Sequence, residues 1–373
     1  MARVYLDHAS SSPARPQVIE TLVPWLGAAD PGRVHTEGRM ARVALEEARE
    51  KVAALLGTRP RQVVFTSGGT EAINAAVYGA VTSGRGEHMV VGAVEHSAVR
   101  DAAARSGRVT TVGVDRQGRL DVRELVDAIG PDTALVHCQW GNHEVGTLQP
   151  VADAVAACRE RGVMIHVDAA AAVGHVPIDF DDLGADLMSI SAHKFGGPKG
   201  AGALLIRRGL RLSPLLVGGD QERARRAGME DVAGQIGFGA AAEILAAGGL
   251  DREAEKARAQ TDRLLSAALA INGVTAFGET TERLPHLICI GVEGVEAEAV
   301  LLGLDQAGVA AHSGSACSSE SLEPSPVLAA MGVDAERSLR LSVGWSTTDE
   351  DIDDACRVLP GVVDRLRALA SSG

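Results

Sequence analysis

Runs of apolar residues alternate with amphipathic stretches along the middle of this chain. From about residue 62 to residue 206, apolar and β-branched residues crowd into runs of about four to eight positions that end at glycine or polar residues, as buried strands do. Helical patterns separate the runs, and such alternation predicts an α/β fold with a mainly parallel seven-stranded sheet and helices on both faces. The predicted strands begin near Gln62, His88, Val109, Thr133, Gly162, Asp186 and Gly202.

Helical periodicity also appears before and after this region. Residues 16–26 and 39–56 are predicted as amphipathic helices, and Gly57 ends the second. A long helix is predicted from 230 to about 270, followed by short strands and by helices near 296–306 and 348–370. A chain of 373 residues exceeds the usual size of one compact domain. We therefore expect a large domain over residues 15–257 and a smaller α/β domain built from residues 1–14 and 258–373.

Two of the predicted strands end in side chains of opposite charge. The run 162–168 ends at Asp168, and the run 186–194 ends at Lys194. Open α/β sheets bind ligands at the carboxyl ends of their strands, so we expect these side chains to meet there. Pyridoxal 5′-phosphate requires a lysine for a Schiff base and an acidic partner that keeps its pyridine nitrogen protonated. The pair therefore predicts a pyridoxal-phosphate enzyme.

The segments around this pair predict a phosphate site. Taken singly, an aspartate or lysine after a strand is more often a helix cap or a solvated loop residue. Here, however, residues that donate hydrogen bonds precede Lys194, and a glycine-rich turn joins a predicted strand to a predicted helix at 66–71. Free N–H groups at such a helix N-terminus bind anions. The residues expected to bind phosphate are Gly69, Thr70, Ser191 and His193.

In order and spacing, these motifs resemble the cysteine desulfurases of the NifS/IscS type. These are class-V aminotransferase-like enzymes with the fold of fold-type I pyridoxal-phosphate transferases. The resemblance covers almost the whole chain and includes many ordered motifs, so it is specific for the family. The matching segments are 5–9, 34–39, 66–71, 95–96, 142–146, 166–168, 191–194, 218–219, 221–223, 314–317 and 338–342.

The resemblance implies a role for each matching residue. Lys194 resembles the Schiff-base lysine that later moves protons, and Asp168 resembles the partner of the pyridine nitrogen. His96 resembles the imidazole that stacks on the ring and exchanges protons near the substrate. Arg340 resembles the arginine that binds the substrate α-carboxylate, a task suited to its bidentate fork. Asn142 is matched to substrate binding as well.

Cys317 resembles the nucleophile that accepts sulfur. It lies among serine and glycine residues at 313–319, a small polar setting that suits an accessible thiolate. The resemblance implies that L-cysteine becomes L-alanine, while the sulfur passes as a persulfide on Cys317 to an acceptor protein. It also implies a homodimer. The remaining cysteines lie in apolar or helical stretches and are predicted to pack as small hydrophobic residues: Cys138, Cys158, Cys289 and Cys356.

Several positions depart from the family pattern. His143 stands where an asparagine usually approaches the phenolic oxygen of the cofactor, and Ala171 replaces the usual glutamine. Met229 replaces a residue whose hydroxyl commonly reaches the phosphate of the neighbouring subunit. These departures leave two alternatives open. One is a C–S or selenocysteine lyase or an aminotransferase on the same scaffold, and the other is a catalytically impaired sulfur-transfer partner.

Composition excludes several other classes. The formal net charge of −13 argues against nucleic acid and anionic membranes as partners, since phosphate binding needs concentrated Lys and Arg. The chain has no uninterrupted run of about 18 apolar residues and no basic-then-apolar leader. Its five cysteines lack paired close spacing and contain no Cys-x-x-Cys zinc motif. We therefore expect a cytoplasmic enzyme without a metal site.

Overall fold

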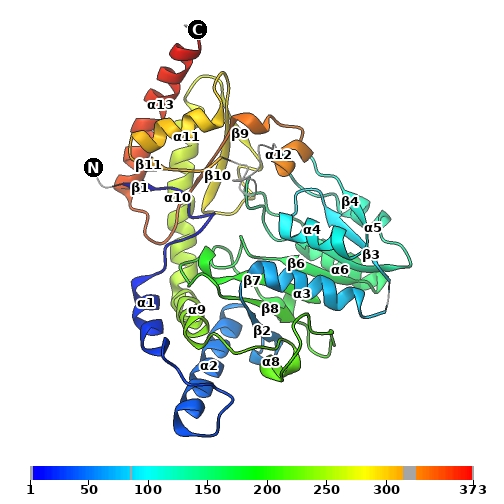
Figure 1. The fold of residues 1–373 in the computed structure, drawn as a ribbon. Coiled ribbons are helices and arrows are strands. Elements are labelled where there is room, and N and C mark those ends of the chain that lie inside the picture. Colours follow the sequence, from blue (N-terminus) through cyan, green and yellow to red (C-terminus); the bar gives the residue numbers. More distant parts are fainter. Residues whose placement is uncertain (1–2, 85, 314–324, 372–373) are drawn as a thin grey trace.

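A large sheet forms the centre of the protein (Figure 1). The computed structural model describes residues 3–84, 86–313 and 325–371. In this part of the chain, seven strands form one sheet in the order β2-β8-β7-β6-β5-β3-β4. Their bounds are β2 Val63–Thr66, β3 His88–Gly92, β4 Arg108–Val112, β5 Thr133–Gln139, β6 Met164–Asp168, β7 Leu187–Ser191 and β8 Gly202–Ile206.

Most neighbouring strands of this sheet run parallel. Strand β3 pairs in parallel with β4 and β5, and β5, β6 and β7 continue in the same direction. Strand β8 is antiparallel to both β7 and β2 because it follows β7 after a short hairpin-like connection. The predicted α/β fold with a mainly parallel seven-stranded sheet is confirmed.

Helices cover both faces of the sheet, as Figure 1 shows. Successive strand residues point to opposite faces, so Val63 and Phe65 join one hydrophobic core while Val64 joins the other. Helices α3 Gly69–Val81 and α4 Ser97–Ser106 pack on the face of Val64. The opposite face carries α2 Thr36–Leu55, α5 Val122–Asp127, α6 Val151–Arg161, α7 Phe180–Leu183 and α9 Val232–Ile244.

A smaller lobe combines the N-terminal segment with the C-terminal part of the chain. Its antiparallel sheet has the order β12-β10-β9, and β1 pairs in parallel with β11. Val4 and Leu6 pack into the same core as residues 257–363. The predicted division at residue 257 stays a prediction, and it falls inside α10. The elements are β1 Val4–Tyr5, β9 Val274–Phe277, β10 Leu287–Val292, β11 Val309–Ala310, β12 Ser338–Ser342, α10 Leu250–Leu269, α11 Ala297–Gln306, α12 Pro326–Ala330 and α13 Asp349–Ala370.

Three predicted helices have different bounds in the structure. The first ends as α1 Pro16–Leu22 and continues as a 3₁₀ turn that contains Pro24, which has no N–H to donate. Helix α2 begins three residues early because the His35 side chain accepts a hydrogen bond from Gly38 N. The long helix is interrupted between α9 and α10 by a π-helical turn, where Gly248 has a φ of 86°.

The stretch Val232–Leu269 has the length and mean hydropathy, 1.2, of a membrane-spanning helix. Within its most apolar window of 18 residues, however, 72% is buried inside the protein. Core helices of soluble proteins have the same composition, so this stretch is weak evidence for a membrane span.

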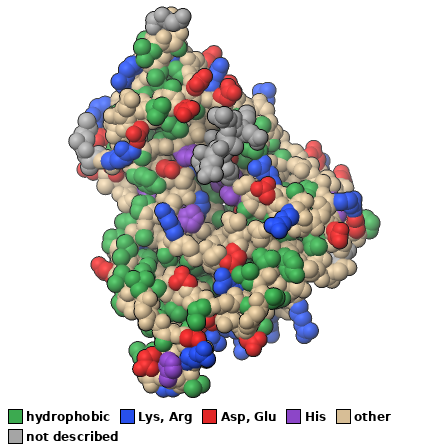
Figure 2. Space-filling model, viewed as in Figure 1, with side chains coloured by type: hydrophobic (Ala, Val, Ile, Leu, Met, Phe, Trp, Pro, Cys, Tyr) green, Lys and Arg blue, Asp and Glu red, His purple; other side chains and the backbone are tan. Residues whose placement is uncertain are grey.

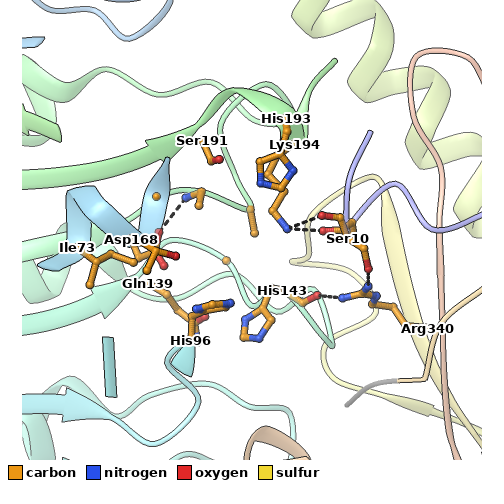
Figure 3. Close-up of a pocket in the computed structure, with 16 residues that line it drawn as sticks. Ser10, Ile73, His96, Gln139, His143, Asp168, Ser191, His193, Lys194 and Arg340 are labelled. Carbon is orange, nitrogen blue, oxygen red and sulfur yellow. Dashed lines mark hydrogen bonds between the residues drawn. The ribbon is translucent and has the colours of Figure 1, made fainter. Parts of the chain in front are cut away.

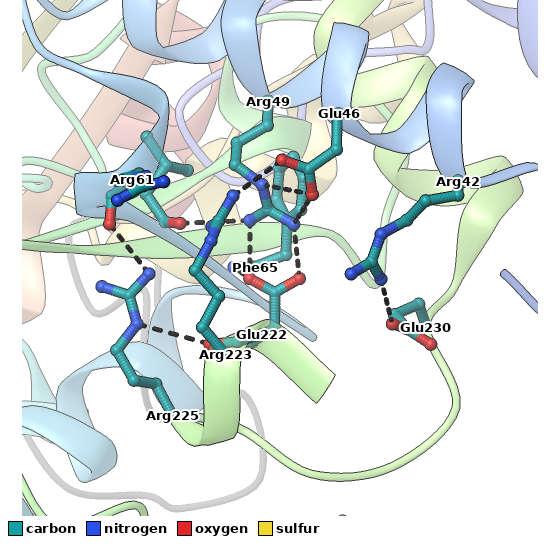
Figure 4. A network of polar contacts seen from close by, with 10 residues as sticks. Arg42, Glu46, Arg49, Arg61, Phe65, Glu222, Arg223, Arg225 and Glu230 are labelled. Atoms are coloured by element: carbon teal, nitrogen blue, oxygen red, sulfur yellow. Dashed lines mark hydrogen bonds and ion pairs between the residues drawn. The ribbon is translucent and has the colours of Figure 1, made fainter. Parts of the chain in front are cut away.

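A left-handed turn beside the large sheet is held by a buried ion pair (Figure 4). Glu222, Arg223 and Ala224 in α8 Gln221–Ala224 all have positive φ, which costs energy for residues other than glycine. The Glu222 carboxylate accepts two hydrogen bonds from Arg49, at 2.6 and 2.7 Å, and one from Phe65 N at 2.9 Å. Both charged side chains are only 2% exposed. The pair therefore fixes the turn to α2 and β2.

Substituting Glu222→Gln is expected to destabilise the protein by about 3–5 kcal/mol, because it removes the buried carboxylate that pairs with the Arg49 guanidinium and leaves only the partly exposed Glu46 beside it. Urea unfolding followed by circular dichroism measures the change. The matched control is Glu46→Gln, which removes the other carboxylate on Arg49, at 3.3 Å and 33% exposed. Its cost should stay below about 1 kcal/mol. An equal loss of unfolding free energy in the two variants would contradict the conclusion that the Arg49–Glu222 pair holds the turn.

Candidate active site

One cavity collects most of the sequence-predicted site residues (Figure 3). Its volume is about 270 Å³, and it lies where β6 and β7 end, beside the start of α3. The N-terminal segment and β12 of the smaller lobe complete its wall. Figure 2, drawn from the side of Figure 1, shows histidine and basic side chains near the middle of the face, where the two lobes meet. The lining residues are Ala9, Ser10, Gly69, Thr70, Ile73, His96, Gln139, Gly141, His143, Asp168, Ala170, Ala171, Ser191, His193, Lys194 and Arg340.

Lys194 reaches the cavity from a 3₁₀ turn rather than from a strand. Strand β7 ends at Ser191, and the turn Ala192–Lys194 follows, so the predicted strand was three residues too long. The chain must reverse here to pair β7 with β8. The Lys194 Nζ donates hydrogen bonds to the carbonyl oxygens of Ala9, at 2.6 Å, and Ser10, at 3.2 Å. A primary amine therefore stands at the cavity edge.

Asp168 is the last residue of β6, as predicted. Its Oδ1 accepts hydrogen bonds from Ala170 N and Ser189 Oγ, both at 3.0 Å. Within the described part of the chain, no hydrogen bond is made to its other oxygen, Oδ2. The side chain is thus fixed at one oxygen, and the other can accept a proton donor in the cavity.

The phosphate-binding residues predicted from sequence also meet at this cavity. Helix α3 begins at Gly69, and no side chain caps its first N–H groups. Thr70 and Ser191 add hydroxyls. His193 Nδ1 is buried, and no described residue bonds to it. Burial and the nearby cations Lys194 and Lys199 lower the pKa of His193 to about 4, so the ring is neutral near pH 7.

Two histidine rings, those of His96 and His143, lie across the cavity from Lys194 in Figure 3. His96 and His143 pack edge to face, with ring centroids 5.0 Å apart. His96 Nδ1 accepts a hydrogen bond from Ala98 N, so a neutral ring carries its proton on Nε2. His143 Nε2 lies 3.5 Å from Glu144 Oε1. His96 therefore has a ring nitrogen, Nε2, suited to proton transfer.

Arg340 comes from β12 of the smaller lobe and is only 1% exposed. Its Nη1 donates to His143 O at 2.8 Å, and its Nη2 donates to Asp7 Oδ1 at 3.0 Å and Ser10 Oγ at 2.5 Å. Its Nε is buried and bonds to no described residue. Arg340 is thus held in place while keeping a donor for a carboxylate.

Asn142 does not line the cavity, and its predicted role in substrate binding stays a prediction. Its Nδ2 donates to Val94 O at 3.1 Å. Its Oδ1 accepts from Glu144 N, at 2.8 Å, and Val145 N, at 2.9 Å. Both amide atoms are therefore used to hold the turn that presents the next residue, His143.

Sequence reasoning missed two polar lining residues. Gln139 ends β5 directly beside Asp168 on β6, and a polar residue that ends a buried strand could have indicated it. Ser10 had no comparable signal, because only the fold of the smaller lobe brings the N-terminal segment to Lys194 and Arg340.

The cysteines divide into two groups. Cys317 lies outside the described residues, so its predicted role stays a prediction. Cys138, Cys158 and Cys289 are buried in hydrophobic cores, as predicted, and Cys356 is half-buried. Burial raises the pKa of all four thiols, that of Cys158 to about 12. These four thiols are therefore poor nucleophiles near neutral pH.

The described residues contain no group of three or more His, Cys, Asp or Glu side chains arranged to hold a metal ion. They do fit pyridoxal phosphate. An amine, an acceptor oxygen and an uncapped helix N-terminus surround one cavity, and His193 Nδ1 is a buried polar atom without a described partner.

Comparisons with known proteins agree with this geometry. The model of the family described as Aminotransferase class-V matches residues 4–354. The chain belongs to the class-V aminotransferase family. A class-V relative from Dictyoglomus turgidum, named cysteine desulfurase IscS, is 41% identical over 98% of this chain and 96% of its own length. Another from Methanosarcina thermophila, with the same name, is 40% identical over 98% and 93%.

Solved structures share the fold. A NifS-like protein superposes with a TM-score of 0.90 at 30% identity and covers 98% of this chain and 100% of its own. A structure titled SspA in complex with cysteine has a TM-score of 0.80 at 29% identity, with coverage of 91% and 98%.

Proposed function

We propose that this chain is a pyridoxal-phosphate-dependent cysteine desulfurase, which converts L-cysteine to L-alanine and transfers the sulfur to an acceptor. One observation carries the proposal: the Lys194 amine, the Asp168 carboxylate and the Arg340 guanidinium line a single cavity of about 270 Å³. Full-length relatives named cysteine desulfurase and the similar SspA fold solved with cysteine support it.

Each group of the cofactor has residues suited to hold it. The first N–H groups of α3, with Thr70, Ser191 and His193, would bind the phosphate. Asp168 Oδ2 would accept the proton of the pyridine nitrogen. When bound, the cofactor supplies an aldehyde that captures amines and a protonated ring that withdraws electrons.

The side chains around the cavity would then bind the substrate and move its protons. Arg340 would hold the α-carboxylate through a charge-assisted hydrogen bond. Lys194 would receive and return the proton at the substrate α-carbon. His96, protonated on Nε2 when neutral, would exchange a proton near the substrate sulfur.

The sulfur step requires a second thiol. In the proposed reaction, the Cys317 thiolate attacks the substrate sulfur, the substrate C–S bond breaks and an S–S bond forms. The substrate carbon then gains a proton and leaves as L-alanine, while the enzyme retains a persulfide. Atoms and electrons balance, because L-cysteine and a thiol together contain the same atoms as L-alanine and a persulfide.

Substituting Cys317→Ala should leave the cofactor bound but reduce alanine formation at least about 100-fold, because the four cysteines of the described residues have raised pKa values and are poor nucleophiles. Mass spectrometry of the trapped persulfide and an alanine assay measure the effect. Cys356→Ala is the control, since this half-buried thiol has a raised pKa. Persulfide formation that survives in Cys317→Ala would exclude the proposed role.

The products separate this function from the alternatives. Desulfuration yields alanine, whereas a lyase that eliminates sulfide yields pyruvate. Purified protein without a visible cofactor band would favour the impaired sulfur-transfer protein. The proposal includes a homodimer and a sulfur-acceptor protein, which rest on the family resemblance, and a cytoplasmic location, which rests on five cysteines without paired close spacing.

A further inference from the structure

A carboxylate lies in the helical turn that carries the proposed phosphate ligands Gly69 and Thr70. Glu71 follows Thr70 in the first turn of α3, and its side chain is only 13% exposed. Its Oε2 accepts a hydrogen bond from Ser67 N at 2.8 Å, just before the helix. A negative charge in the same turn as these ligands would repel a bound phosphate, because partly buried charges are poorly screened by solvent.

Arg226 is the counter-charge to this carboxylate. Its Nε donates to Glu71 Oε1 at 2.8 Å, and its Nη2 donates to Glu71 Oε2 at 3.2 Å. Burial alone would raise the pKa of Glu71, but the hydrogen bonds from Arg226 and Ser67 lower it below its ordinary value. Glu71 is therefore ionised near pH 7, and its charge is balanced by one guanidinium.

The position of Arg226 is built into the fold. It follows the left-handed turn that the Arg49–Glu222 pair holds, drawn in Figure 4. Ala227 N donates to Leu216 O at 3.1 Å, and Gly228 N donates to Gln221 Oε1 at 3.2 Å, so the segment is also fixed directly after the arginine. A strained turn persists only where its surroundings hold it. Here the turn at residues 222–224 places Arg226 against Glu71.

We propose that Arg226 is a positioning residue for the cofactor phosphate, and that it acts by neutralising and orienting Glu71 at the N-terminus of α3. Neither Arg226 nor Glu71 lines the cavity in the described residues, so the effect would act through the charge of Glu71, next to Thr70, rather than through contact with the phosphate. The inference rests on the proposed function, because it concerns the phosphate of pyridoxal phosphate.

The test compares two ligands that differ only in the phosphate. Apoprotein is titrated with pyridoxal phosphate and with pyridoxal, and the ratio of the dissociation constants reports the phosphate contribution. In Arg226→Gln, we expect pyridoxal phosphate to bind about tenfold more weakly while pyridoxal binds as before, because the unbalanced Glu71 repels only the phosphate. Inorganic phosphate, used as a competitor, should also bind the variant more weakly by a similar factor.

The decisive variant is the double substitution. Adding Glu71→Gln to Arg226→Gln removes the uncompensated charge and should restore the ratio of the two ligands. Failure of this rescue, or an equal loss of pyridoxal affinity in Arg226→Gln, would overturn the inference. Glu71→Gln alone leaves the Arg226 charge uncompensated and should strengthen the binding of pyridoxal phosphate relative to pyridoxal, so an unchanged or weakened ratio in this variant would overturn the inference even if Arg226→Gln does not fold.

The control for charge alone is Arg207→Gln, because Arg207 is an exposed arginine paired with Asp186 at 2.8 Å. Arg207→Gln should leave the ratio of the two dissociation constants unchanged. If it weakens pyridoxal phosphate as much as Arg226→Gln does, the inference is overturned. If the wild-type apoprotein binds pyridoxal phosphate no more tightly than pyridoxal, the proposed function itself fails. That outcome is distinct from a change that appears only in the variants.

Discussion

Replacing Lys194 with alanine is expected to abolish the visible absorbance of covalently held cofactor and to reduce alanine formation by a factor on the order of 10³ or more. Lys194 is the one lysine that lines the cavity in the described residues, and it would provide both the covalent attachment and the proton transfer. An absorbance spectrum of the purified variant and the rate of alanine formation from L-cysteine measure the two effects.

Lys199→Ala provides the matched control. Lys199 lies five positions further along, is exposed and does not line the cavity. It should bind the cofactor and form alanine at the wild-type rate. A Lys194→Ala variant that still holds the cofactor covalently would contradict the assignment of Lys194.

Acidification is expected to destabilise the protein steeply, because burial lowers the pKa of several histidines. The pKa values are lowered to about 4 for His8 and His193 and to about 3 for His137 and His175. Burial and neighbouring histidines also lower the pKa of His166 and His286 well below 6.5. Below about pH 6.5 the unfolded chain binds protons that the folded chain does not, so stability falls as the pH decreases towards 4.

The size of the effect follows from the number of protons. Each such histidine contributes a slope of up to about 1.4 kcal/mol per pH unit between its unfolded and folded pKa values. Glu95 acts in the opposite direction, since burial and Asp168 raise its pKa to about 8, but it contributes only one proton. The net slope should therefore be on the order of several kcal/mol per unit between about pH 6 and 5.

Urea unfolding midpoints measured from about pH 7.5 to 5 test this prediction. His166→Asn should lower the pH slope of the unfolding free energy by the contribution of about one proton, because the buried ring that it replaces no longer titrates. A midpoint that does not change over this range would show that these rings are not buried as neutral groups.

Much of the large sheet could be predicted from the sequence alone. Seven strands were placed correctly because buried strands need apolar residues on both faces, and those runs are short and sharply bounded. Asp168 and Lys194 were found for the same reason, since ligands lie at strand carboxyl ends. Helix ends were predicted less well, as the N-cap at His35 and the break at Gly248 show.

Other parts of the site depended on tertiary structure. The sequence did not show which of two adjacent residues, Asn142 or His143, faces the cavity, because that choice depends on the hydrogen bonds of one turn. It did not indicate that Ser10 would contact Arg340, which is 330 positions away. Nor did it show that Glu222 would adopt a left-handed conformation, because a buried partner from α2 compensates the strain.

The sequence by itself determined the type of fold and the chemistry of the central pair, an amine and a carboxylate at neighbouring strand ends. These features are local, because strand periodicity and residue type suffice to predict them. Only the tertiary structure decided which side chains from the smaller lobe and the N-terminal segment complete the cavity, and which buried charges hold them. Such contacts join residues far apart in the chain, and their geometry arises only when the two lobes pack together.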